Sequence, residues 1–385
     1  MSIHVGIVVN YGGDFARSRI RFAHYLIKKG YEVTAIVPAD GHSDSIREAG
    51  IPVLELRTDG RGKGFANKLG YLRELKRVFK ANHFDIIHFR GLQNSLIGTP
   101  VAALYSKAKI VNHITGLGIS FSSSGLLNWI VQVLIKAIYQ IESLLFKPNY
   151  IFQNSYDNRT LGIRRRLVIV KGSAVNEDRF DPGLYQRRHP EVAESAVSPR
   201  REGDELIFLF VSRLLYAKGV MDLIAAFQHA QDDLPPNSRL WIVGWSDHQN
   251  PSAVSVAHLE EITRHNQQIE ILGRRTDIPE LIAMSDVGIL PTRYREGTPR
   301  FMLESMAMSR AIVTTNMPGC DHLVREEENG ILVEPGDRAE LQQALLDIAR
   351  KDYVRMGKRG REIYFEDFSE EVVYSGIQNF YAELV

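Results

Sequence analysis

The stretch Pro291–Met308, PTRYREGTPRFMLESMAM, is the part of this 385-residue chain from which its fold can be predicted. It places two carboxylates, Glu296 and Glu304, eight positions apart, with Gly-Thr-Pro between them. Proline suits the first turn of a helix, where its missing N–H costs no hydrogen bond. From Arg300 onward the apolar residues recur with a helical period. We therefore predict a turn followed by a helix that begins near Arg300.

This predicted helix start lies between the two carboxylates, with Glu296 just before it and Glu304 inside it. The unpaired N–H groups of the first turn and the positive end of the helix dipole point the same way, which favours a bound diphosphate. A sugar nucleotide has hydroxyls at both ends and a diphosphate in the middle. One carboxylate could therefore accept hydrogen bonds from the sugar and the other from the ribose. Two chance glutamates on a solvated helix face are the simpler alternative.

Length and composition set broad limits. A chain of 385 residues suggests about two or three domains, and 44% hydrophobic residues are ample for their cores. The single cysteine, Cys320, excludes an intramolecular disulfide and a cysteine-based zinc site, and it fits a reducing compartment. The apolar run Ile3–Val9 is short and continues into a polar loop, so we predict no signal peptide.

The net charge of +1 conceals an asymmetry along the chain. Residues 1–180 hold 25 Lys and Arg against 13 Asp and Glu, a net charge of +12, and the remainder carries −11. A basic N-terminal half favours an anionic partner, such as a phosphate-bearing acceptor or a membrane surface. Nucleic acid is the competing partner, but no nucleic-acid-binding motif supports it.

The N-terminal residues predict a strand, a glycine loop, a helix over 15–29 and a second strand over 32–38, which is how a doubly wound α/β domain begins. The loop lacks G-x-G-x-x-G, so no nicotinamide site is predicted. Arg17 and Arg21 are four residues apart on the predicted helix and would share a face. They could meet an acceptor phosphate or be a solvated basic face.

Two further segments of the N-terminal half are candidates for acceptor or membrane contact. The glycine-rich basic stretch 57–68 contains Arg61 and Lys63 and is predicted to be a loop. Residues 125–147 are the most apolar region, interrupted by a narrow polar stripe that includes Lys136. A helix this apolar is either buried or packed among lipid headgroups, and Trp129 would suit the second environment. The polar interruptions exclude a membrane span.

Several predicted strands end in polar residues, and ligands of open α/β sheets bind at the carboxyl ends of strands. His113 and Thr115 follow one such strand, over 109–113. In the second half we predict strands over 206–211, 239–243, 269–273, 286–291, 311–315 and 330–333, and a helix over 338–351.

The stretch from Glu296 to Glu304, followed by MAMSRAIVTTNMPGCDHLV and NGILVEPGD, resembles the signature of family 4 retaining glycosyltransferases. The variant EGTPRFMLESMAM is similar to that of transferases that extend sugars on undecaprenyl diphosphate. The resemblance implies the GT-B fold, two Rossmann-like doubly wound α/β domains facing across a cleft. It implies an N-terminal acceptor-side domain over 1–165, a linker over 166–204, a nucleotide-sugar-binding domain over 205–367, and a terminal helix, 368–385, that packs back on the first domain.

The resemblance also implies roles for individual residues. Arg213 and Lys218 match the family's two cations, which would stabilise the charge that develops on the leaving diphosphate. Glu296 would hold the transferred sugar, and many members place a catalytic His where this chain has Thr115, so that His113 is the alternative. The donor-binding residues implied in this way are Gly12, Gly13, Arg274, Gly297, Thr298, Phe301, Met302 and Glu304. No metal or other cofactor is expected, because the two cations serve the diphosphate and no Asp-x-Asp motif ends a strand.

The resemblance thus implies a retaining transferase that moves a hexose or N-acetylhexosamine from a nucleotide donor, with uridine the commonest base, to a lipid-linked saccharide in cell-surface polysaccharide assembly. It would be cytoplasmic and peripheral on the inner membrane, with no nucleic-acid partner. Three alternatives stay open: an epimerase or phosphorylase on the same fold, a sugar-nucleotide-binding protein without turnover, and a soluble transferase with a small-molecule acceptor.

Overall fold

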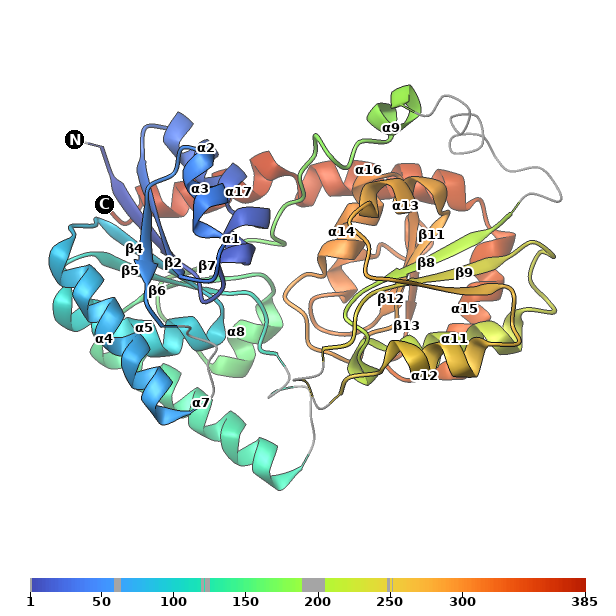
Figure 1. The fold of residues 1–385 in the computed structure, drawn as a ribbon, viewed down its shortest axis with the longest axis horizontal. Helices are drawn as coiled ribbons and strands as arrows, with labels where there is room; N and C mark the ends of the chain where they lie inside the picture. Colours follow the sequence, from blue (N-terminus) through green and yellow to red (C-terminus); the bar gives the residue numbers. More distant parts are fainter. Residues whose placement is uncertain are drawn as a thin grey trace. The chain divides into compact units, whose positions relative to one another are not determined.

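The computed structural model describes residues 2–58, 64–118, 121, 125–188, 205–247, 250 and 252–385. The chain divides into two compact units, the first of Met1–Ser173 with Glu370–Val385 and the second of Ala174–Ser369. Each unit is built on one parallel sheet with helices on both of its faces (Figure 1). The predicted class, two doubly wound α/β units, is confirmed.

The sheet of the first unit is seven-stranded and parallel, in the order β3-β2-β1-β4-β5-β6-β7. The order reverses between β1 and β4, which is where open α/β sheets bind ligands. The strands are β1 (His4–Val8), β2 (Glu32–Pro38), β3 (Val53–Leu56), β4 (Ile86–Arg90), β5 (Lys109–Ile114), β6 (Asn149–Phe152) and β7 (Leu167–Ile169).

Helices cover this sheet in two groups (Figure 1). One face carries α1 (Gly12–Ser18), α2 (Ile20–Lys28), α3 (Ser43–Glu48) and α17 (Glu370–Ala382). The other carries α4 (Phe65–Ala81), α5 (Leu92–Tyr105), α7 (Leu126–Leu145) and α8 (Ser155–Leu161). The C-terminal helix α17 packs on α2, where the rings of Tyr374 and Phe22 lie 5.2 Å apart.

The predicted single helix over 15–29 is wrong in two respects. It starts earlier, at Gly12, and it breaks at Arg19, whose backbone (φ −119°, ψ −17°) separates α1 from α2. Neither proline nor glycine marks this break in the sequence. The early start has a physical cause, because the Asp40 carboxylate accepts a hydrogen bond from the Gly12 N–H at 2.7 Å and satisfies a donor of the first turn.

The second unit has a six-stranded parallel sheet in the order β10-β9-β8-β11-β12-β13. Its strands are β8 (Ile207–Val211), β9 (Arg239–Val243), β10 (Ile269–Gly273), β11 (Val287–Leu290), β12 (Ala311–Thr315) and β13 (Gly330–Val333). They match the predicted ranges closely. Parallel strands that are covered on both faces are continuous apolar runs, which are easy to recognise in a sequence.

Helices on the two faces of this sheet are also seen in Figure 1. One face carries α13 (Ile278–Met284), α14 (Arg300–Ala307) and α16 (Tyr353–Asp367), and the other α11 (Val220–Ala230), α12 (Val256–Thr263) and α15 (Arg338–Arg350). Two 3-10 turns, η1 (Tyr216–Lys218) and η2 (Asp321–Leu323), lie in loops, and α9 (Pro182–Arg188) precedes β8.

The predicted linker over 166–204 begins within regular structure. Residues Leu167–Ile169 form β7 and pair with β6 in the sheet of the first unit. The division between the two units falls at Ser173–Ala174. The short strand was missed because three residues are too few to show a period.

Two loops of the second unit are joined by backbone contacts around Gly219. The loop after β8 accepts a hydrogen bond at the Ala217 carbonyl from the Arg293 N–H, at 2.8 Å. Gly219 has φ +78°, and a Cβ added there would lie 2.0 Å from the Pro291 carbonyl oxygen. Only glycine permits both this backbone conformation and this approach. The contact fixes the neighbouring Lys218 relative to the loop that carries Glu296.

Replacing Gly219 by Ala should therefore destabilise the second unit far more than its backbone angle alone requires. Gly273→Ala is the matched control, because Gly273 has φ +64° with nothing within 4 Å of the added Cβ. We expect a loss of about 1 kcal/mol for Gly273→Ala and about 3 kcal/mol or more for Gly219→Ala. Urea unfolding of both variants measures the difference, and equal losses would show that the Pro291 contact is easily relieved.

Candidate functional site

The candidate site lies at the carboxyl edge of the six-stranded sheet, where the loops after β8, β11 and β12 meet. These three strands are neighbours in the order β8-β11-β12, so their loops emerge side by side. The loop after β8 carries Arg213 and Lys218, the loop after β11 carries Glu296, and the loop after β12 carries Gly319. Residues distant in sequence are thus brought together by strand order alone.

Lys218 and Glu296 form a buried ion pair at the centre of this edge. The Lys218 Nζ is in direct contact with the Glu296 Oε1, and the two side chains are only 10% and 14% exposed. The Tyr294 ring centroid lies 5.0 Å from the same Nζ. Burial, helped by the nearby Arg213 guanidinium, lowers the pKa of Lys218 to about 7. The sequence-predicted cation and carboxylate therefore share one enclosed position.

The backbone beside Glu296 is held from the other side by Gly319. This glycine has φ +93°, and a Cβ there would lie 2.2 Å from the Glu296 carbonyl oxygen and 2.5 Å from that of Gly297. Thr298, two residues after Glu296, shares a hydrogen bond of 3.3 Å between its Oγ1 and the His322 Nε2. The turn from Glu296 to Thr298 is thereby fixed on both sides.

The helix after this turn, α14, begins at Arg300 as predicted, with Pro299 at its N-cap. Helix geometry leaves the first N–H groups without a carbonyl partner inside the helix. Phe301 and Met302 are buried and anchor this first turn in the core. The N-terminus of α14 thus follows directly on the loop of Glu296.

Glu304 lies one turn further along α14, with its side chain 13% exposed. Burial raises its pKa above the usual value, although Arg300, 3.5 Å away, and Arg179 oppose the shift. The Arg179 guanidinium also donates to the Thr276 carbonyl at 2.6 Å. A largely buried carboxylate can accept hydrogen bonds from hydroxyl groups of a ligand.

Two residues of this edge were not predicted from the sequence. Asp247, in the loop after β9, accepts a hydrogen bond of 2.9 Å from Arg213 and orients its guanidinium. Trp245, in the same loop, is 47% exposed, and the Arg274 guanidinium carbon lies 5.6 Å from its ring centroid. Both follow the apolar strand β9 directly, so an aromatic and an acid just after a buried strand were the available signal.

In the first unit, Gly12 and Gly13 lie in the first turn of α1. A Cβ at Gly12 would be 2.4 Å from the Asp40 Oδ1, and the Gly12 N–H is already engaged by Asp40. Gly13 packs closely on Tyr11, whose ring atoms would lie within 2.8 Å of an added Cβ. Close packing alone therefore explains why both positions are glycine.

His113 and Thr115 differ in accessibility. His113 is 1% exposed, and within the described part of the chain neither of its ring nitrogens has a hydrogen-bond partner. Its ring lies 5.3 Å from that of His88, which contacts the Tyr381 hydroxyl of α17. Burial lowers the pKa of both histidines well below the usual value, so both are neutral. Such enclosure argues against direct substrate contact by His113, whereas Thr115 is half-buried in the loop after β5.

The predicted basic contacts of the first unit are dispersed. The helix break places Arg17 on α1, where its guanidinium carbon lies 5.4 Å from the Tyr11 ring centroid, and Arg21 on α2, where it forms an ion pair with Glu370 of α17. The two arginines thus lie on separate helices and have different partners, so they do not share one helix as predicted. Trp129 is 60% exposed on α7 and Lys136 is half-buried on the same helix. Arg61 and Lys63 lie outside the described residues.

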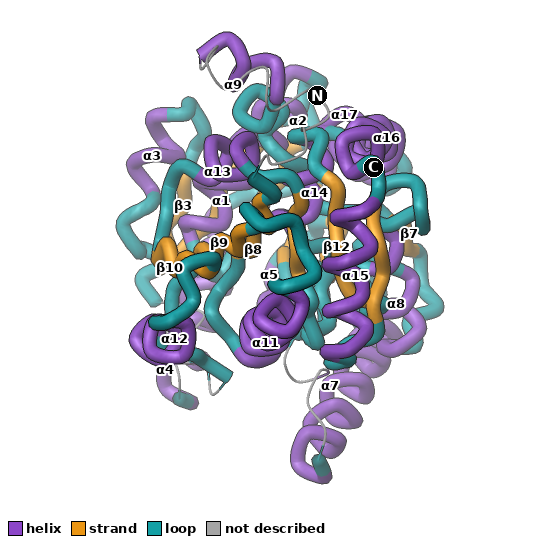
Figure 2. Tube along the Cα trace, turned by 90° about the vertical axis from the view of Figure 1, so that its right-hand side faces the viewer, coloured by secondary structure: helices purple, strands orange, loops and turns teal. Residues whose placement is uncertain are grey.

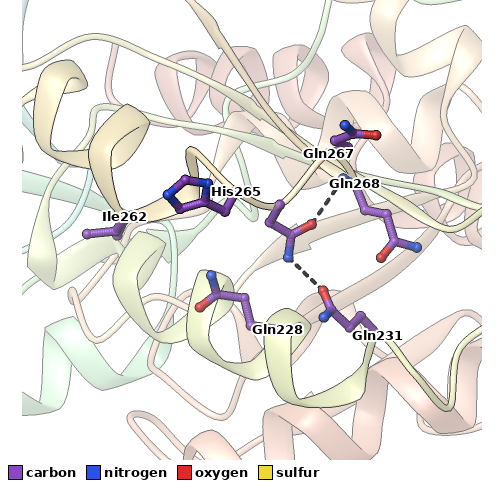
Figure 3. A pocket seen from close by; sticks show the side chains of 7 residues that line it. Gln228, Gln231, Ile262, His265, Gln267 and Gln268 are labelled. Carbon is purple, nitrogen blue, oxygen red and sulfur yellow. Dashed lines mark hydrogen bonds between the residues drawn. The ribbon is translucent and has the colours of Figure 1, made fainter.

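A hollow of about 500 Å³ in the second unit is unrelated to this edge. It is lined by Ile262, His265 and amide side chains from the end of α11 and from the segment before β10. Asn266 of that segment donates to the Gln231 Oε1 at 2.6 Å (Figure 3). Among the residues that the structure describes, no group of His, Cys, Asp and Glu side chains is arranged to hold a metal ion. In that same portion of the chain, no helix combines the length and the apolar character needed to cross a membrane.

Comparison with known proteins identifies the family and the fold. Residues 205–351 match the family model described as glycosyl transferases group 1, and residues 7–148 match that described as glycosyl transferase 4-like. The crystal structure of the Anabaena protein HepE in complex with UDP is similar, with a TM-score of 0.76, 17% identity and coverage of all of both chains. The fold is therefore that of the GT-B glycosyltransferases.

Two characterised relatives align with this chain along most of their length. The N,N'-diacetylbacillosaminyl-diphospho-undecaprenol alpha-1,3-N-acetylgalactosaminyltransferase of Campylobacter jejuni is 24% identical over 92% of this chain and 91% of its own. The UDP-Gal:alpha-D-GlcNAc-diphosphoundecaprenol alpha-1,3-galactosyltransferase of Escherichia coli is 22% identical over 89% of this chain and 85% of its own. The chain belongs to glycosyltransferase family 4, the retaining group 1 transferases, as its central motif predicted.

Proposed function

We propose that this protein transfers a hexose or N-acetylhexosamine from a UDP-sugar to a hydroxyl of a lipid-linked saccharide, with retention of the anomeric configuration. The observation that carries the proposal is the enclosed Lys218–Glu296 pair at the carboxyl edge of the second unit, next to Arg213 and the start of α14. A cation, a carboxylate and a helix N-terminus at one point suit the leaving phosphate, the sugar and the bridging diphosphate in turn.

The donor would lie along the sheet edge. Arg213 and Lys218 hold the diphosphate with the N–H groups of Gly297, Thr298, Phe301 and Met302. Glu304 accepts hydrogen bonds from the ribose, and the base lies toward β9 and β10, near Arg274. HepE, whose fold is similar, was crystallised with UDP, which supports a uridine donor.

Trp245 would be the platform on which the base stacks. One side of its indole faces the Arg274 guanidinium, and almost half of the residue is exposed at the edge where the base is proposed to bind. Aromatic stacking is favourable for any base, since every base has a π-face. Asp247, which lies in the same loop as Trp245, holds the Arg213 guanidinium. Arg213 would then place the diphosphate next to the base.

The acceptor proposal is supported by the printed activities of the two relatives, both of which act on saccharides carried by undecaprenyl diphosphate. The first unit would be the acceptor side, since residues 1–180, which contain most of this unit, carry a net charge of +12 and the acceptor carries a diphosphate. Transfer would take place at the cytoplasmic surface of the membrane that holds the lipid.

The reaction breaks the bond between the sugar C1 and the β-phosphate oxygen and forms a bond from C1 to the acceptor oxygen. The acceptor proton passes to the departing phosphate, which leaves as UDP. Glu296 stabilises the positive charge that develops at C1, and Lys218 and Arg213 stabilise the negative charge on the phosphate. We propose that these two cations suffice without a bound metal ion. In the first unit, Thr115 is the more accessible of the two strand-end candidates.

The test is transfer of radiolabelled sugar from a panel of UDP-sugars, in EDTA, to an undecaprenyl-diphosphate disaccharide. We expect acceptor-dependent counts in the lipid phase. Glu296→Gln should lower turnover by about two to three orders of magnitude, because it removes the charge that supports C1. Its donor affinity should stay the same or rise, because Lys218 loses a competing anion. Glu261→Gln, at an exposed position of α12, is the control.

Other outcomes of this assay would replace the proposal. A new UDP-sugar formed without acceptor would indicate an epimerase, and dependence on inorganic phosphate a phosphorylase. Counts in a water-soluble product would indicate a small-molecule acceptor. Tight donor binding with no product would indicate a binding protein, and activity lost in EDTA would overturn the metal-free mechanism.

Donor affinity should fall as the pH rises through the pKa of Lys218, which is about 7. Only the protonated amine attracts the diphosphate, and above its pKa each pH unit costs up to about tenfold in affinity. The Glu296 carboxylate favours the charged form, so the fall should begin at pH 7 or above. Calorimetry with a UDP-sugar from pH 6 to 8.5 measures it. Lys218→Arg stays charged throughout and should bind with no such slope.

Trp245→Ala should weaken UDP-sugar binding about 5- to 100-fold, while Trp245→Phe keeps most of the affinity. Pyrophosphate has no base, so its affinity should be the same in the wild type and in both variants. Competition calorimetry separates the two ligands. An equal loss for pyrophosphate and UDP-sugar would show that Trp245 supports Arg213 and Arg274 and does not stack on the base.

A further inference from the structure

Most of the exposed large hydrophobic side chains described in the first unit lie on α7, which the proposed donor site does not use. Ten large hydrophobic side chains of this 20-residue helix are exposed, with Leu126 and Leu127 three-quarters exposed. They are Leu126, Leu127, Trp129, Ile130, Val133, Leu134, Ile138, Ile141, Leu144 and Leu145. Their spacing of three and four residues places them along one continuous face over the whole helix.

The opposite face of α7 attaches the helix to its unit, and it is the more polar face. Tyr139, Glu142 and Ser143 are the buried residues of the helix. The Tyr139 hydroxyl donates to the Leu92 carbonyl of α5 at 2.6 Å, and the Gln140 Nε2 donates to the Leu161 carbonyl of α8 at 3.3 Å. The helix is thus inverted relative to an ordinary surface helix, with its apolar side outward. Of the two environments that the sequence allowed for this helix, burial in the core is therefore contradicted.

The exposed face also lacks negative charge. Glu142 is the only acidic residue in α7, and it is 4% exposed. Burial raises its pKa to about 8, so it is uncharged near neutral pH. Lys136 lies on the helix and Lys147 just beyond its end, where it is exposed. An apolar helix face with cations and no exposed carboxylate on the same helix is complementary to an anionic lipid surface.

We propose that the outward face of α7 lies among the headgroups of an anionic bilayer and holds the protein at the membrane surface. The helix lies parallel to the membrane, because its Tyr139 side is packed against α5 and α8 and cannot enter lipid. Its N-terminal turns run clear of the other elements of the first unit in Figures 1 and 2, so the bilayer can reach them. Trp129, in the second turn, sits at the interface.

This proposal extends the proposed function, since an acceptor with a polyprenyl chain stays in the bilayer and the enzyme must come to it. It does not depend on turnover. Vesicle binding can therefore be measured without donor or acceptor, and the inactive Glu296→Gln variant should bind vesicles as the wild type does. A failure of the transfer assay would leave this result unchanged.

The experiment is flotation with vesicles of phosphatidylcholine and phosphatidylglycerol. Leu134→Glu/Ile141→Glu places two charges at positions more than half exposed, so the fold should tolerate them. We expect vesicle binding to fall about tenfold or more per residue replaced. Ile27→Glu, at a 41% exposed position of α2 in the same unit, is the control and should bind normally. Binding should weaken, too, with pure phosphatidylcholine.

Two readouts separate the membrane from other occupants of this face. Vesicles should shift the tryptophan emission of the wild type to the blue, and Trp129→Phe should abolish the shift. Light scattering reports the oligomeric state. The proposal is overturned if the double variant binds vesicles like the wild type. If the double variant also converts a wild-type dimer to a monomer, a second copy of the chain covers this face instead.

Discussion

The ion pair between Lys218 and Glu296 is the interaction on which the second unit's site depends. A buried pair repays the loss of hydration only if its geometry is fixed. Two close backbone contacts fix the loops that carry this pair, one between Gly219 and Pro291 and one between Gly319 and Glu296. At both glycines an added Cβ would collide with the carbonyl oxygen opposite. Under the proposed function an arriving diphosphate competes with Glu296 for Lys218. Donor binding would then free the Glu296 carboxylate to interact with the transferred sugar.

The first unit differs, because it holds an ion pair and two buried histidines near its sheet edge. Asp14 accepts from Arg90 at 2.9 Å, and although burial opposes it, Arg90 and Arg19 hold the pKa of Asp14 well below its usual range. The neutral His88 meets Tyr381, which comes from the far end of the chain. The core of the first unit is therefore completed only when α17 is in place, so residues 1–173 alone would leave His88 and Phe22 without their partners.

The parts of the structure that could be predicted are those set by local pattern. The strands over 239–243, 269–273 and 311–315 and the helix start at Arg300 need only apolar runs and a proline, so they are found where expected. The break at Arg19 has no proline or glycine to signal it in the sequence. The same holds at the site: carboxylate spacing indicated Glu296 and Glu304, whereas Trp245 and Asp247 matter only because strand order places them beside Arg213.

The helix α7 shows the limit of sequence reasoning most plainly. Its polar stripe and apolar face were visible in the sequence, but amphipathicity does not say which face meets the protein. In the structure, Tyr139 donates a hydrogen bond to the Leu92 carbonyl, and the more polar side of α7 faces the protein. In water alone such an orientation is unfavourable, since the exposed leucines gain nothing and the buried Glu142 loses its hydration. An orientation that water disfavours is understandable if water is not the solvent of that face. Under the proposed membrane contact, lipid would cover the exposed leucines of this face.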